Sequence, residues 1–163
     1  ALYLLRTKYG IDMCLAIVGG DIIRNNFQRI KTLNKIRERN LSSYVKICGY
    51  VSTKELVSLY NGAELMCFPS LYEGFGLTIV ESMACGVPVV VSDVKSSREI
   101  AGDAAYFVDP YNEESIAAGI YKISVDDTLR KNLIKGGLER AKLFSWEKTA
   151  QETLGVYRII NSL

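Results

Sequence analysis

Two glutamates and two glycines lie close together between residues 73 and 81. Gly74 and Gly76 follow Glu73 directly, and an apolar, helix-like stretch that contains Glu81 begins at Leu77. Free N–H groups at a helix N-terminus bind anions, and glycine lets the backbone come close because it has no Cβ. Carboxylates beside such a turn accept hydrogen bonds from hydroxyl groups. The pattern therefore predicts a cradle for a ligand that carries phosphate and hydroxyl groups.

Glu81 stands in a stretch whose other side chains favour burial. Its near neighbours are small or apolar, namely Ile79, Val80, Met83 and Ala84. A carboxylate without a partner would be costly to bury in such a segment, and a ligand is one way to provide that partner. A glycine-rich turn with a nearby acid also occurs in folds that bind nothing there, and two glycines alone leave that alternative open.

Short apolar runs alternate with helix-like segments along the chain. The runs that predict strands cover residues 13–18, 45–48, 65–68, 87–91 and 104–108. The first run is continuous in apolar residues, which is typical of a strand buried on both faces. The alternation predicts an α/β fold with a doubly wound, Rossmann-like parallel sheet, in which ligands bind beyond the carboxyl ends of the strands. The segment with the two glutamates follows the third of these strands and lies at that edge.

Apolar spacing and capping residues predict the helices. Residues 21–40 carry an apolar stripe at helical spacing, and Ser52 with Glu55 forms a capping box for a helix that begins at about Thr53. The length and the apolar content favour one domain over residues 1–163.

The last third of the chain contains no predicted strand. From about residue 112 to 163 we expect three helices, with breaks near 126–127 and at Ser145, which can cap the last of them. Trp146 is the single tryptophan, and we expect it to be a buried anchor of the core.

The composition excludes several kinds of site. The chain has no histidine, which removes a histidine triad, a histidine–metal site and an imidazole base. With 20 basic and 18 acidic residues the net charge is +2, too balanced for a nucleic-acid-binding surface. No apolar stretch reaches the roughly 20 residues that span a bilayer. The four cysteines stand singly, which predicts buried thiols in a reducing, cytoplasmic compartment.

Two runs around the glutamates resemble a known family. Residues 69–77 and 81–90, with Glu73 and Glu81 as an E-x7-E pair, resemble the signature of glycosyltransferase family 4, the retaining GT-B glycosyl transferases of group 1. Further landmarks of that family follow in the family's order at residues 15–20, 48–52, 108–110 and 144–147. The chain is thus similar to the C-terminal, donor-binding half of such an enzyme.

The resemblance implies that the chain binds a nucleotide diphosphate sugar and that the enzyme moves its hexose to a saccharide or lipid-linked acceptor. It implies that Glu73 contacts the sugar and that Glu81 holds the ribose. The resemblance places main-chain contacts to sugar and diphosphate at Gly74, Phe75, Gly76 and Leu77, and the base pocket at Gly49, Tyr50 and Val51. Glu73 is the catalytic candidate, which we expect to position the sugar, since the leaving diphosphate can take the acceptor's proton. No metal and no further cofactor are implied.

Part of the family pattern is expected outside this sequence. The resemblance implies, upstream of Ala1, a first strand with a Gly-Arg pair, a later lysine, and an N-terminal domain that binds the acceptor. In the family that strand lies beside the third predicted strand, so we expect two unpaired strand edges inside the sheet. The isolated chain is expected to bind donor weakly and to transfer nothing. For the full-length enzyme the resemblance allows peripheral association with the inner face of the membrane.

Three other functions stay open at the level of sequence. Nucleotide-sugar 2-epimerases share the two-domain architecture but rely on histidines that this chain lacks. A dinucleotide-dependent oxidoreductase would need a third glycine after Gly74 and Gly76. A non-catalytic nucleotide-sugar-binding scaffold would keep the cradle without a catalytic partner domain.

Overall fold

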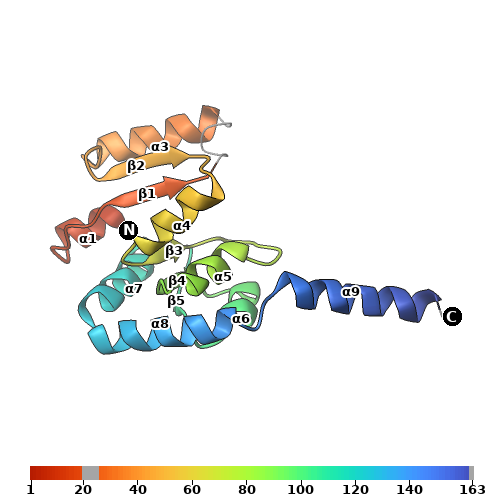
Figure 1. The fold of residues 1–163 in the computed structure, drawn as a ribbon. Helices are drawn as coiled ribbons and strands as arrows, with labels where there is room; N and C mark the ends of the chain where they lie inside the picture. The colour runs from red at the N-terminus through yellow and green to blue at the C-terminus, as the bar shows by residue number, and fades with distance from the viewer. Residues whose placement is uncertain (20–25, 162–163) are drawn as a thin grey trace.

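The computed structural model describes residues 1–19 and 26–161, and strands and helices alternate along them (Figure 1). The strands are β1 (Leu15–Val18), β2 (Val45–Gly49), β3 (Met66–Phe68), β4 (Val89–Ser92) and β5 (Tyr106–Val108). Each pairing between them is parallel. The predicted α/β fold with parallel strands is confirmed.

The helices fall where apolar spacing and capping residues predict them. They are α1 (Leu2–Thr7), α3 (Asn26–Glu38), α4 (Thr53–Asn61), α5 (Leu77–Ala84), α6 (Lys95–Ala101), α7 (Glu113–Val125), α8 (Asp127–Ala141) and α9 (Trp146–Asn161). The capping box before α4 is present, because the Ser52 hydroxyl accepts from the Glu55 amide and the Glu55 carboxylate accepts from the Ser52 amide. The predicted helix over 21–40 begins at residues 21–25, which lie outside the described part of the chain.

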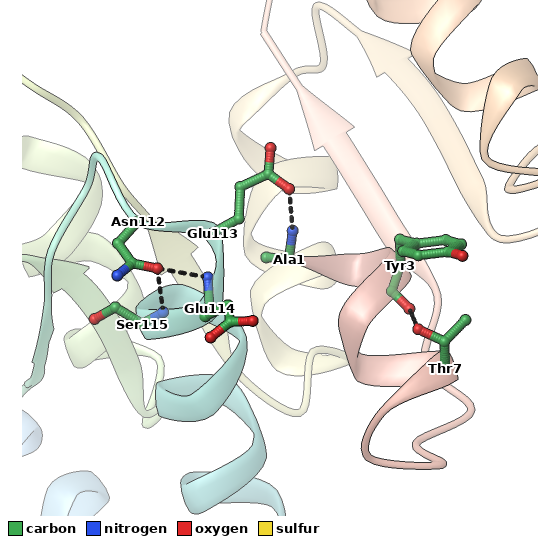
Figure 2. A network of polar contacts seen from close by, with 7 residues as sticks. All are labelled: Ala1, Tyr3, Thr7, Asn112, Glu113, Glu114 and Ser115. Carbon is green, nitrogen blue, oxygen red and sulfur yellow. Dashed lines mark hydrogen bonds and ion pairs between the residues drawn. The ribbon is translucent and has the colours of Figure 1, made fainter.

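The last third of the chain forms α7, α8 and α9, as predicted, and each of these helices starts at a capping side chain. Asn112 Oδ1 accepts hydrogen bonds from the amides of Glu114 and Ser115 at the start of α7 (Figure 2). Asp126 and Ser145 accept from backbone amides in the same way at the starts of α8 and α9. Local side-chain hydrogen bonds therefore determine where these helices start.

The strands form two separate sheets (Figure 1). One sheet pairs β1 with β2, and the other has the order β3-β4-β5. Among the described residues, β1 and β3 each pair on one side only. The sheet is therefore interrupted between β1 and β3, which agrees with the two unpaired edges expected from the strand order of the family.

The core of the molecule is built around β4. Val89, Val90 and Val91 have no exposed surface. Successive side chains of a strand point to opposite faces, so Val89 and Val91 pack with α5 and α6, whereas Val90 packs with α1 and α7. Helices on both faces of β4 give the three-stranded sheet the layered arrangement of a doubly wound fold.

The prediction that residues 13–18 form a strand buried on both faces is wrong. Leu15 is 39% exposed and Val18 is 38% exposed. The reason is that, within the described ranges, β1 packs mainly against its strand neighbour β2 and not between helices on both of its faces. The expectation of buried thiols fails for the same part of the chain, because Cys14 is exposed, while Cys48, Cys67 and Cys85 are partly buried.

Trp146 is not the predicted core anchor, because 73% of its surface is exposed. It is the first residue of α9, which projects away from the body of the molecule and buries none of its residues (Figure 1). A helix that touches so little of the domain offers the indole no apolar surface to pack against.

None of the helices in the described ranges is long and apolar enough to cross a bilayer.

Candidate functional site

The turn from β3 into α5 forms the centre of the candidate site. Gly76 is the N-cap residue of α5, with φ 101° and ψ 49°, a conformation that residues with a Cβ rarely adopt. A Cβ at this position would lie 3.2 Å from Ile79 Cδ1. Because glycine has no side chain, it cannot cap the helix, so α5 begins without a side-chain cap, and the positive end of such a helix favours a negatively charged ligand.

The fold requires a glycine at position 76 but not at position 74. Gly74 is exposed, its φ is not positive, and a Cβ built on it would meet nothing within 4 Å. Neither packing nor backbone conformation therefore explains a glycine at 74. A ligand that approaches the backbone closely would explain it, because such a ligand would meet a Cβ.

Glu73 is partly buried and is held by a residue three positions before it. The Ser70 hydroxyl lies 2.8 Å from Glu73 Oε1 and 3.1 Å from the Tyr72 carbonyl oxygen, so its one proton is shared between two acceptors. Glu73 also lines a hollow of about 280 Å³ between this loop and the start of α6. The other lining residues are Leu71, Tyr72, Val94, Lys95, Ser96 and Glu99. The carboxylate is thus oriented at the wall of an open space.

Glu81 is exposed, although its neighbours in sequence favour burial. The inner face of α5 is formed by Ile79, Ser82 and Met83, which recur at helical spacing. Glu81 falls on the other side of the helix. Its partner is Tyr60 at the end of α4, whose hydroxyl donates a hydrogen bond of 3.4 Å to Glu81 Oε2. The carboxylate therefore needs no ligand to offset burial, and its suitability for a ligand rests on its position.

The predicted base-binding residues lie at the carboxyl end of β2. Gly49 is buried, has φ 70°, and accepts a hydrogen bond of 2.8 Å from the Gly19 amide. Tyr50 is 86% exposed, and Val51 lines an open hollow of about 880 Å³ between β2 and α4. This hollow shares no lining residue with the hollow at Glu73. The helix α4 connects the predicted base-binding residues to Glu81, since it begins shortly after Val51 and its last turn contains the tyrosine that contacts Glu81.

Two pairs of side chains near the site have defined electrostatics. Burial, with the Glu81 carboxylate as a second cause, raises the pKa of the Tyr60 phenol above its ordinary value. Just before α6, hydrogen bonds from the guanidinium of Arg98, a residue of that helix, lower the pKa of Asp93. Arg98 also stacks over the Phe107 ring, 4.4 Å from its centroid, so it joins α6 to β5.

Ser70 and Tyr60 were not among the predicted site residues. Their sequence signal is weak, because a serine after a strand and a tyrosine on an apolar helix stripe both have ordinary structural roles. No group of three or more potential metal-ligating side chains occurs within residues 1–19 and 26–161.

Comparison with known proteins decides the family. A sequence profile described as "Glycosyl transferases group 1" matches residues 1–140. The chain belongs to this family. The O-antigen chain mannosyltransferase B of Escherichia coli is 42% identical over 117 residues, which are 72% of this chain and 31% of that protein. The chain thus spans less than a third of the length of this group 1 relative.

Two solved structures share the fold of this group 1 domain. The C-terminal domain of the glycosyl transferase group 1 family protein LpcC from Francisella tularensis matches with a TM-score of 0.75 at 23% identity, over 86% of this chain and 73% of that one. Anabaena HepE, solved in complex with UDP and glucose, matches with a TM-score of 0.83 at 20% identity, over 99% of this chain and 44% of that one. The fold is that of a C-terminal domain of a GT-B glycosyltransferase.

Proposed function

We propose that this domain binds a nucleotide diphosphate sugar at the turn between β3 and α5. The observation that carries the proposal is the N-terminus of α5, which has no side-chain cap and is preceded by Gly74, a glycine that the fold itself does not require. Backbone amides at residues 74–77 bind the diphosphate, with no metal. The HepE complex, which contains UDP and glucose, supports this class of ligand for a domain of the same fold.

The two glutamates hold the hydroxyl groups of the donor on either side of the diphosphate. Glu73, at the wall of its hollow, accepts from the sugar, and Glu81, on the exposed side of α5, accepts from the ribose. Gly49, Tyr50 and Val51 contact the base through backbone and apolar groups. The donor is a nucleotide diphosphate that carries a hexose. GDP-mannose is the first candidate, because a relative of this chain is named a mannosyltransferase.

The reaction proposed for the full-length protein is transfer of the hexose to a saccharide or lipid-linked acceptor with retention of configuration. Charge develops on the diphosphate as the bond to the sugar breaks. The amides at the start of α5 are already directed at that charge, and such preorganised donors lower the barrier without reorganising. Glu73 fixes the orientation of the sugar, while the leaving diphosphate accepts the proton of the acceptor hydroxyl.

Calorimetry on the full-length gene product tests the binding site. GDP-mannose, UDP-glucose and ADP-glucose are titrated into the protein and into Glu81→Ala, with Glu113→Ala as a matched control, because Glu113 is an exposed glutamate at the start of α7. We expect one donor to bind, Glu81→Ala to weaken it about tenfold, and the control to leave it unchanged. Failure of all three donors to bind, or equal affinity in Glu81→Ala, would contradict the proposed site.

A further inference from the structure

Tyr60 is a buried residue whose polar end reaches the candidate site. It lies in the last turn of α4, and only 7% of its surface is exposed. Its hydroxyl lies 3.4 Å from Oε2 of Glu81, an exposed residue of α5. A rigid, packed ring thus contacts a side chain that would otherwise move freely in solvent.

The direction of this hydrogen bond is fixed by chemistry. Because burial and the neighbouring carboxylate both disfavour the phenolate, the phenol keeps its proton and is the donor. An ionised carboxylate has about four acceptor positions, so the bond to Tyr60 occupies one of them at Oε2 and leaves Oε1 to accept from another group.

We propose that Tyr60 is a positioning residue for ribose recognition. It holds Oε2 of Glu81, so that Oε1 is placed to accept a hydrogen bond from a ribose hydroxyl. The inference rests on the proposed role of Glu81 in donor binding. An exposed glutamate loses the freedom of several torsions when it binds a ligand, and a hydrogen bond formed in advance removes part of that loss. Neither the apolar packing of Tyr60 nor the proposed contacts of residues 73–77 require this hydroxyl.

The test compares two ligands that differ in one hydroxyl. GDP-mannose and its 2′-deoxyribose counterpart, or the UDP-glucose pair if only that donor binds, are titrated into the full-length gene product by calorimetry. The ratio of the two Kd values measures how strongly the protein recognises the ribose hydroxyl. We expect Tyr60→Phe, which keeps the ring, to lower this ratio about fivefold, the effect of one lost hydrogen bond.

Two further variants separate positioning from packing. Tyr121→Phe removes a hydroxyl from a ring that stacks on Tyr9, away from Glu81, and is expected to leave the ratio unchanged. In a Glu81→Ala background, Tyr60→Phe is expected to have no further effect, because the carboxylate that Tyr60 positions is gone. Because each ratio compares two ligands on the same variant, a partly unfolded sample does not alter it.

The outcomes distinguish this inference from the function on which it rests. If Glu81→Ala leaves the ratio high, the ribose role of Glu81 in the proposed function is wrong, and so is the inference. If Glu81→Ala lowers the ratio but Tyr60→Phe does not, the donor site stands and the positioning role is overturned. An equal effect of Tyr60→Phe with and without Glu81 also overturns it, because the tyrosine then acts through packing.

Discussion

The Ser70 hydroxyl orients Glu73, since it lies 2.8 Å from Glu73 Oε1. Replacing Ser70 with alanine removes that donor and frees the carboxylate to adopt other rotamers. We expect the KM for the donor to rise roughly fivefold, with a smaller change in kcat, and Ser70→Thr to restore the original value. Initial rates over a range of donor concentrations measure both constants. A Ser70→Thr variant as impaired as Ser70→Ala would show that the hydroxyl is not what matters.

Replacing each of the two glycines of the turn with alanine is expected to change stability by different amounts. Gly76→Ala forces a Cβ into a left-handed conformation and towards Ile79, so we expect a loss of about 1–2 kcal/mol in the free energy of unfolding. Gly74→Ala meets no atom, so we expect its stability to change by less than about 0.5 kcal/mol.

Donor affinity, by contrast, is a property in which Gly74→Ala is expected to change. The Cβ of Gly74→Ala stands where the diphosphate is proposed to approach, so its donor affinity is expected to fall about tenfold although the protein stays as stable. Urea unfolding and calorimetry on both variants provide the comparison. A Gly74→Ala variant that binds donor normally would leave glycine at 74 without a ligand-based reason.

At the scale of the elements, close packing of α7 on β5 depends on Gly119. A Cβ there would lie 2.6 Å from Val108 Cγ1 on β5, which is too close for any real contact. Gly119→Ala is therefore expected to lower the free energy of unfolding by roughly 1–3 kcal/mol, since the helix must move away from the strand.

Gly155 in α9 is the matched control for Gly119. A Cβ at this helical glycine meets nothing within 4 Å, so Gly155→Ala is expected to raise stability by up to about 1 kcal/mol through helix propensity alone. Chemical unfolding of both variants gives the two free energies. Equal effects of the two substitutions would contradict the close contact between α7 and β5.

Elements set by neighbouring residues could be predicted from the sequence, and elements set by distant partners could not. The capping box at Ser52 and the cap at Ser145 act within one turn, so the residues at each helix start are enough to predict it. The exposure of β1 depends on which distant elements cover its two faces, which an apolar run does not reveal. Trp146 looks the same in sequence whether its helix packs on the core or projects from it.

The candidate site, too, could be predicted from the sequence only where its residues are close together in the chain. The glycines and the E-x7-E pair are adjacent in sequence, and the structure places them on one loop and the helix that follows. The partner of Glu81 is 21 residues away on another helix, so the contact with Tyr60 exists only in the fold. The side of α5 that Glu81 occupies depends on which face of the helix meets β4, which its apolar neighbours in sequence do not reveal.

At the scale of the whole molecule, the two sheets differ in how well they are protected. The amides of β4 lie between β3 and β5 and among fully buried valines, whereas β1, which pairs with β2, is exposed at three of its four residues. We expect hydrogen exchange of the chain to show the slowest amides in β4 and much faster exchange in β1. Nuclear magnetic resonance of the labelled chain resolves these residues. Equal protection in β1 and β4 would argue against an interrupted sheet.

The exposed position of Trp146 decides what optical measurements on this chain can report. The chain has one tryptophan, and its indole is already largely in water in the folded state. Its emission will therefore change little when the core around β4 unfolds, so fluorescence would underestimate unfolding that circular dichroism detects. The same indole is a sensitive reporter of any surface that covers the start of α9, because such contact would shift its emission to shorter wavelength.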